Sequence, residues 1–196
     1  MKKLVLASSN PGKLRELSAL LDKSRYKIIP QSEFKVPDVA ETGTTFVENA
    51  IIKARHAAEH TGHAALADDS GLVVDALNGE PGVYSARFSG SHANDESNNA
   101  LLVEKLGSIP EAQRSARYQA VIVYMRNAAD PSPIICEGSW EGIILLEAKG
   151  SGGFGYDAYF YLPDYGCTSA ELSADEKNRV SHRGQALRLL LERIPH

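Results

Sequence analysis

The sequence predicts an α/β protein, because short apolar runs typical of strands alternate with longer segments of helical periodicity. The most informative stretch is residues 64–74, where an apolar run reaches Asp68, Asp69 and Ser70, is interrupted by Gly71 and then resumes. We expect a buried strand that ends near the two carboxylates. Because successive strand side chains point to opposite faces, Asp68 and Asp69 are not expected to face the core together.

Two interpretations of this stretch remain open at the level of the sequence. An Asp-Asp-Ser-Gly segment is ordinary turn chemistry and would suit a solvated turn. Alternatively, the carboxylates mark a ligand site, because α/β proteins bind their ligands at strand ends. An unpaired buried carboxylate is costly, so a ligand or a cation would have to compensate for it.

The composition is that of an ordinary globular protein. The 196 residues suit one large domain or two lobes that share a core, and the net charge of −4 argues against a nucleic-acid-binding surface. Cys136 and Cys167 lack metal-binding spacing and resemble the free thiols of a reducing compartment. The short apolar run at residues 4–7 predicts a first strand rather than a signal peptide, and no stretch is long enough to cross a bilayer. We therefore expect a cytoplasmic protein without a nucleic-acid or membrane partner.

The first strand leads into a predicted anion site. Asn10 suits a helix N-cap and Pro11 the first helical position, and leucines recur at helical spacing over residues 14–21. The free amides of such a helix end attract anions. Lys13 opposes the helix dipole unless an anion lies there, so the segment suits either a phosphate contact or a plain capped helix with an exposed lysine. The GxxxxGK pattern is absent, which excludes a P-loop kinase.

The next elements follow from turn and capping signals. We expect a strand at 26–29, a loop at 30–43 that contains Glu41, and a helix from a capping box at Thr45 to about Gly62. Lys53 on that helix is either a solvated residue or a second phosphate contact. The remaining expected elements are a helix through 100–106, a central strand at 118–124, its hairpin partner at 134–141 with a continuation at 142–146, and two helical segments after Ser173.

The most glycine-dense stretch is residues 150–157. Glycines let the backbone approach a ligand closely, so Phe154 is a candidate stacking platform for a base. The alternative is a flexible hairpin tip with Phe154 in the core. Further along, residues 181–184 interrupt the helical pattern and bring Lys177, His182 and Arg183 to one break, as another cluster of donors.

Five motifs, at residues 8–13, 41–50, 67–72, 152–157 and 181–183, occur in the order of one family. From Lys3 to about Leu191 the chain resembles the inosine triphosphate pyrophosphatases (Ham1/RdgB-like proteins), specifically their bacterial dITP/XTP pyrophosphatase branch. Ala158 stands where the family commonly has proline, which removes a rigid turn but no recognition group.

The resemblance implies an α/β fold with an elongated mixed sheet flanked by helices, within a single domain (1–196) of two interwoven lobes with a nucleotide cleft between them. It implies a homodimer that uses Mg²⁺ to hydrolyse purine nucleoside triphosphates to the monophosphate and pyrophosphate. Glu41 and Asp69 would hold Mg²⁺, with Asp69 also the catalytic proton acceptor. The phosphate-binding residues would be Ser8, Ser9, Asn10, Pro11, Gly12, Lys13 and Lys53. The other substrate-binding residues would be Ser70, Phe154, Gly155, Tyr156, Asp157, Lys177, His182 and Arg183.

The physical chemistry agrees with this assignment. Mg²⁺ and lysines neutralise charge on phosphoryl groups, and donors near His182 would favour the C6 oxygen of inosine and xanthosine over the amino group of adenine. Such an enzyme would remove deaminated purines (dITP/ITP and XTP/dXTP) from the nucleotide pool. The alternatives are a Maf-type pyrophosphatase of other specificity, which substrate choice would distinguish, and a non-catalytic nucleotide sensor. The three acidic residues Glu41, Asp68 and Asp69 argue against the sensor, because a pure binder would not need metal-held water. Asp68 could support a metal ligand, be one itself, or act as an alternative base.

Overall fold

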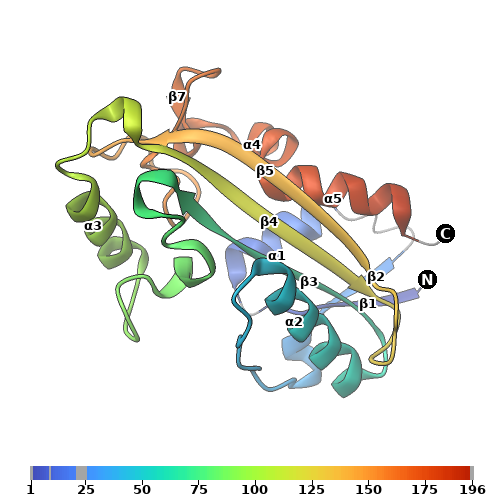
Figure 1. Ribbon diagram of the computed structural model, residues 1–196. Coiled ribbons are helices and arrows are strands. Elements are labelled where there is room, and N and C mark those ends of the chain that lie inside the picture. Colours follow the sequence, from blue (N-terminus) through green and yellow to red (C-terminus); the bar gives the residue numbers. More distant parts are fainter. Residues whose placement is uncertain (1, 9, 21–25, 195–196) are drawn as a thin grey trace. The chain divides into compact units, whose positions relative to one another are not determined.

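The computed structural model describes residues 2–8, 10–20 and 26–194, which form a mixed sheet flanked by helices (Figure 1). The seven strands follow the order β2-β1-β3-β4-β5-β6-β7. β1 pairs in parallel with β2 and β3, whereas β6 pairs antiparallel with β5 and β7. The strands are β1 (Lys2–Leu6), β2 (Tyr26–Pro30), β3 (Ala64–Val74), β4 (Ser115–Met125), β5 (Ile134–Ile144), β6 (Phe160–Leu162) and β7 (Cys167–Thr168). The helices are α1 (Pro11–Leu20), α2 (Phe46–Thr61), α3 (Asp95–Leu106), α4 (Ala174–Val180) and α5 (His182–Arg193).

Most predicted elements are confirmed, because local capping and periodicity specify them. The Thr45 capping box starts α2, and Gly62 ends it in the left-handed conformation, with φ 65°. The predicted strand at 118–124 lies within β4, the middle strand of the sheet, and β5 includes its hairpin partner and part of the continuation. The break that was predicted at 181–184 separates α4 from α5 at Ser181.

The expectation for the two aspartates is wrong in two respects. β3 does not end near them but runs unbroken for 11 residues through Asp68, Asp69, Ser70 and Gly71, which also excludes a solvated turn. Both carboxylates are buried, since Asp68 is 1% exposed and Asp69 5% exposed. The alternation of side chains holds, but helices cover both faces of β3 here, so opposite faces both lie inside the protein.

The chain divides into two compact units, which take alternating segments of sequence. Unit 1 contains the described residues of segments 1–69, 120–138 and 183–196, and unit 2 contains residues 70–119 and 139–182. β3, β4 and β5 therefore each contribute residues to both units. The single domain over 1–196 and the cleft between lobes stay predictions.

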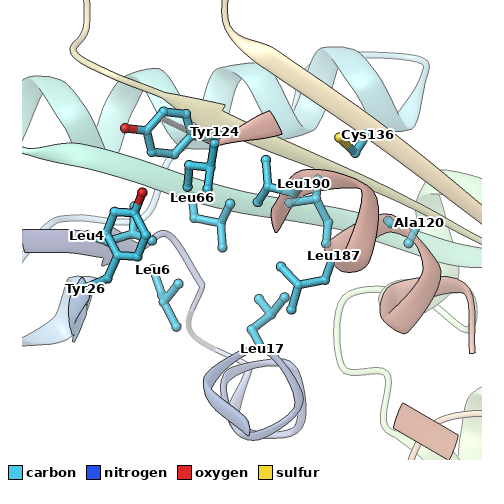
Figure 2. Close-up of a cluster of buried hydrophobic side chains, with 13 residues drawn as sticks. Leu4, Leu6, Leu17, Tyr26, Leu66, Ala120, Tyr124, Cys136, Leu187 and Leu190 are labelled. Carbon is cyan, nitrogen blue, oxygen red and sulfur yellow. The ribbon is translucent and has the colours of Figure 1, made fainter. Parts of the chain in front are cut away.

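Unit 1 has apolar clusters on both faces of its strands. One cluster joins Leu6 and Leu66, paired across β1 and β3, to leucines of α1 and α5 (Figure 2). The other joins the neighbouring pair Val5 and Ala65 to the alanines of α2. Strand alternation therefore directs Asp68 towards the α1 and α5 side and Asp69 towards the α2 side.

Unit 2 has a cluster rich in aromatic residues. Phe160 is fully buried and packs against Tyr118 and Trp140, with ring centroids 4.6 Å and 5.7 Å away. Leucines of α3 complete this cluster. Among the residues that the structure describes, no helix is both long and apolar enough to span a membrane. Cys136 and Cys167 are free thiols, as predicted.

Two leucines of α5 provide a test of the unit 1 core. Leu187 is fully buried, whereas Leu189 is 46% exposed. We expect Leu187→Ala to lower the free energy of unfolding by about 2–5 kcal/mol, because it removes buried methyl groups and leaves a cavity. Leu189→Ala should change it by less than about 0.5 kcal/mol. Urea denaturation measures both, and equal losses would contradict the described packing.

Candidate active site

Asp68 is the centre of a buried ionic cluster on the α1 and α5 side of β3. Its Oδ1 lies 2.7 Å from the Lys13 ammonium of α1, and its Oδ2 accepts a hydrogen bond of 3.0 Å from Arg183 Nε of α5. Arg183 also donates from Nη1 to Glu16 of α1. Asp68 thereby links both helices to the strand, and each of its carboxylate oxygens has a cationic partner.

These charges set one another's protonation. Burial alone would raise the pKa of Asp68, but Arg183 and Lys13 outweigh it and hold the pKa well below its usual range. Burial lowers the pKa of Lys13, and the carboxylate of Asp68 opposes that change. The anion that was predicted to balance Lys13 at the helix end is therefore present within the protein, as Asp68.

The first turn of α1 corrects the expectation of free amides. The Asn10 side chain caps the helix as predicted and accepts hydrogen bonds from Gly12 N and Lys13 N at 2.9 Å and 3.1 Å. The amide of Asn10 donates to Ser8 Oγ, and Pro11 has no N–H to offer. An anion at this end must therefore meet the side chains of Ser8, Asn10 and Lys13, or displace the cap. Ser9, also predicted to bind phosphate, lies outside the described residues.

Asp69 lies on the α2 side of the strand and has a different environment. Lys53 of α2 places its ammonium 2.7 Å from Asp69 Oδ1 and 3.2 Å from Glu41 Oε1. The second oxygen, Asp69 Oδ2, is buried and has no hydrogen-bond partner among the described residues. Burial raises the pKa of Asp69 against the effect of Lys53. Burial alone would lower the pKa of Lys53, but the carboxylates of Asp69, Glu41 and Asp68 outweigh burial, and the pKa of Lys53 is raised.

Glu41 lies in an irregular loop that α2 holds in place. The buried Asn49 accepts a hydrogen bond of 2.8 Å from Gly43 N through its side-chain oxygen. A Cβ on Gly43 would lie 2.5 Å from Glu48 Cβ and 2.7 Å from that same oxygen, so only glycine fits here. The loop approaches α2 closely, which places Glu41 beside Lys53.

The carboxylates fit a magnesium site that is completed by a ligand. Within the described part of the chain, no three His, Cys, Asp or Glu residues are arranged to hold a metal ion. Mg²⁺, however, commonly takes only one or two protein carboxylates and completes its shell with phosphates and water. Glu41 and Asp69 each place a carboxylate oxygen on the Lys53 ammonium, and the buried Oδ2 of Asp69 has no hydrogen-bond partner among the described residues.

In unit 2, Asp157 organises the glycine-rich loop. Its Oδ2 accepts hydrogen bonds from Phe154 N at 2.8 Å and from the Lys177 ammonium at 2.6 Å, and its Oδ1 accepts one from Ser169 Oγ at 2.8 Å. The Lys177 ammonium also lies 4.9 Å from the centre of the half-buried Phe154 ring. Asp157 thus supports Phe154 and Lys177, and the loop is not a flexible hairpin tip.

Tyr156 and His182 are both buried in unit 2. The Tyr156 hydroxyl donates to the carbonyl of Ser85 at 2.7 Å, so its ring anchors the loop. The His182 ring stacks on Tyr118, with centroids 4.8 Å apart and planes 9° apart, and lies near Trp140. These contacts fix the orientation of the imidazole ring.

The predicted site residues fall into two groups. Unit 1 holds the phosphate and metal candidates, and Arg183, which was predicted for the base side, lies with them and bonds to Asp68. Unit 2 holds the remaining predicted substrate residues: Ser70, Phe154, Gly155, Tyr156, Asp157, Lys177 and His182. The roles assigned to the individual residues stay predictions.

Known proteins of similar sequence and fold identify the family. The Ham1 family matches residues 4–193. The chain belongs to the Ham1 family. A dITP/XTP pyrophosphatase of Thioalkalivibrio sulfidiphilus is 58% identical over 192 residues, which cover 98% of each chain. A solved HAM1 protein from Coxiella burnetii has a TM-score of 0.90 at 54% identity and covers 97% of this chain and 96% of its own. A nucleoside-triphosphatase/dITP/XTP pyrophosphatase from Mycobacterium abscessus has a TM-score of 0.77 at 44% identity, with 96% and 98% covered.

Several residues that support the candidate site were not found from the sequence. Glu16 holds Arg183, and Asn49 holds the Glu41 loop. Asp95 and Asn99 of α3 hydrogen-bond to the main chain of Gly155. The available signal was the pair Asn98-Asn99 inside a helix, because asparagine is a poor helix former and is retained there for its hydrogen bonds.

Removal of the Asp68 charge tests the ionic cluster. Asp68→Asn would leave the buried Arg183 and the largely buried Lys13 beside each other without their shared anion, so we expect a loss of about 3–5 kcal/mol in the free energy of unfolding. The control is Glu80→Gln, which breaks an exposed pair with Lys105 and should cost less than about 1 kcal/mol. Urea denaturation distinguishes the two, and a loss in Asp68→Asn no larger than in the control would contradict the cluster's role.

Proposed function

We propose that the chain is a nucleoside-triphosphate pyrophosphatase that hydrolyses non-canonical purine nucleotides, dITP/ITP and XTP/dXTP, to the monophosphate and pyrophosphate. Its relatives carry the name dITP/XTP pyrophosphatase at 54–58% identity over nearly the whole chain. One observation within the chain supports the chemistry best. Asp69 keeps a buried oxygen without a hydrogen-bond partner among the described residues, beside Lys53 and Glu41.

We further propose that the reaction depends on Mg²⁺, held by Glu41 and Asp69. When bound, Mg²⁺ supplies positive charge that stabilises the phosphoryl oxygens of the transition state. Lys13 and Lys53 place two further positive charges in the same unit, where they can bind the triphosphate. Ser8 and Asn10 add neutral donors at the start of α1.

Asp69 has the second role of proton acceptor. The oxygen of a water molecule forms a bond to phosphorus, the phosphoanhydride bond to the departing group breaks, and the water's proton passes to a carboxylate oxygen of Asp69. Asp68 is unsuited to this role, because both of its oxygens face cations. Its contacts with Lys13 and Arg183 instead support a role in holding those cations in place.

The base side of the proposed site lies in unit 2. Phe154 offers a ring face for stacking. The Lys177 ammonium lies close to that ring, and the His182 ring is stacked on Tyr118. Donors there would pair with the C6 oxygen of hypoxanthine or xanthine and would face the amino group of adenine donor to donor. We also propose a cytoplasmic homodimer, for which family membership is the support.

The first experiment measures pyrophosphate release from dITP, XTP, dGTP, dATP and dTTP, with and without Mg²⁺. We expect Mg²⁺-dependent release from dITP and XTP well ahead of the others. Asp69→Asn should lower the rate at least about 100-fold, because it removes the proton acceptor and a metal ligand. Asp38→Asn, the same change at an exposed position in unit 1, is the control and should keep full activity.

Three outcomes would contradict the proposal. Equal turnover of every triphosphate would leave a pyrophosphatase without the base selection, and preference for dTTP would favour the Maf-type specificity. Binding of inosine nucleotide without any release of pyrophosphate would identify a sensor.

A further inference from the structure

Helix α3 holds both main-chain groups of Gly155, the residue after Phe154. Asp95 Oδ2 accepts a hydrogen bond of 2.7 Å from Gly155 N, and Asn99 Nδ2 donates one of 2.9 Å to Gly155 O. The two side chains, which we call the α3 pair, are four residues apart and so lie on one face of the helix. One rigid element therefore fixes a single peptide position from two directions.

An asparagine at position 99 is unfavourable for the helix itself, which indicates that its contact with the loop is useful. Asn99 is buried within α3, the helix whose Leu102 and Leu106 join the aromatic-rich cluster, and a buried apolar residue would leave no polar group to satisfy. Asparagine also lowers helix stability at such a position. Its side-chain amide donates a hydrogen bond to Gly155 O, so the benefit of this residue lies in the loop.

The α3 pair completes a set of anchors around Phe154. On one side, Phe154 N donates to Asp157; on the other, the α3 pair holds Gly155, and the next side chain, Tyr156, is fixed on a carbonyl of unit 2. Gly153 and Gly155 both have left-handed φ angles, 74° and 63°. Glycines at such positions leave the unanchored chain many conformations, so the anchors remove a freedom that a ligand would otherwise have to remove on binding.

We propose that Asp95 and Asn99 are positioning residues that preorganise Phe154 as the stacking platform for the base. This inference rests on the proposed function, since the platform has a use only if a nucleotide binds there. The hydrogen bonds of the α3 pair to Gly155 lie within unit 2, whereas the proposed phosphate and metal ligands belong to unit 1. Loss of the α3 pair therefore weakens base binding equally in the ground state and in the transition state, which changes KM rather than kcat.

The test uses Asp95→Ala and Asn99→Leu in the full chain. Asn99→Leu replaces the amide by an apolar side chain of similar branching and so removes the donor. Asp95→Asn keeps an acceptor oxygen and serves as the conservative rescue. Glu96→Ala is the matched control, because Glu96 is exposed in the same helical turn and also carries charge at the start of α3. Amide hydrogen exchange at residues 150–157 reports the anchoring without any substrate.

We expect faster exchange of the loop in both disruptive variants and a KM for dITP about 10-fold higher, with kcat within about twofold. Inhibition by inosine monophosphate should weaken by a similar factor, whereas inhibition by pyrophosphate should stay unchanged. Asp95→Asn and Glu96→Ala should resemble wild type in every measurement. A merely destabilised protein would instead lose affinity for both inhibitors.

Two results would overturn the inference and can be told apart. If the wild-type enzyme is active and both Asp95→Ala and Asn99→Leu keep its KM for dITP, the α3 pair has no role in base binding. If the wild-type protein neither hydrolyses dITP nor binds inosine monophosphate, the proposed function is wrong, and so is the role of Phe154 as a stacking platform.

Discussion

The buried carboxylate of Asp68 is the constraint on which the unit 1 site depends. A carboxylate at this depth is stable as an anion only with close cations, and it has two, from α1 and from α5. Arg183 is itself buried and Lys13 is largely so, and both charges would be costly without Asp68. The three charges therefore fix the positions of two helices relative to β3, in a way that an apolar contact, being non-directional, would not.

The alternation of side chains along β3 then gives the adjacent residues Asp68 and Asp69 different surroundings. Asp68 has both oxygens occupied by cations, which makes it a structural anion. Asp69, one residue later and on the other face, has one oxygen on Lys53 and a second that lacks a hydrogen bond among the described residues. Two consecutive residues therefore differ: both carboxylate oxygens of Asp68 contact cations, whereas Asp69 has an oxygen that could bind a ligand. The strand period is the cause of this difference.

Local sequence rules predicted the elements well, and long-range packing explains what they missed. The caps at Asn10, Thr45 and Ser173 depend on contacts three residues away, so the sequence carries them directly. That β3 continues past Gly71 depends on pairing with other strands, which no local pattern encodes. Likewise, the sequence showed a lysine in need of an anion but could not show that Asp68, far along the chain, provides it.

The two halves of the predicted site are supported by different physical means. In unit 1, ion pairs between buried or largely buried side chains hold the site. These ion pairs are strong because the local dielectric is low and salt screens them little. In unit 2, neutral hydrogen bonds and stacked rings hold the loop and His182, with Asp157 and Lys177 as the charged pair among them. A polyanionic ligand group needs positive charge at fixed positions, whereas a flat, neutral base needs a rigid face and directional donors. Each kind of support therefore matches the part of a purine nucleotide that it is proposed to bind.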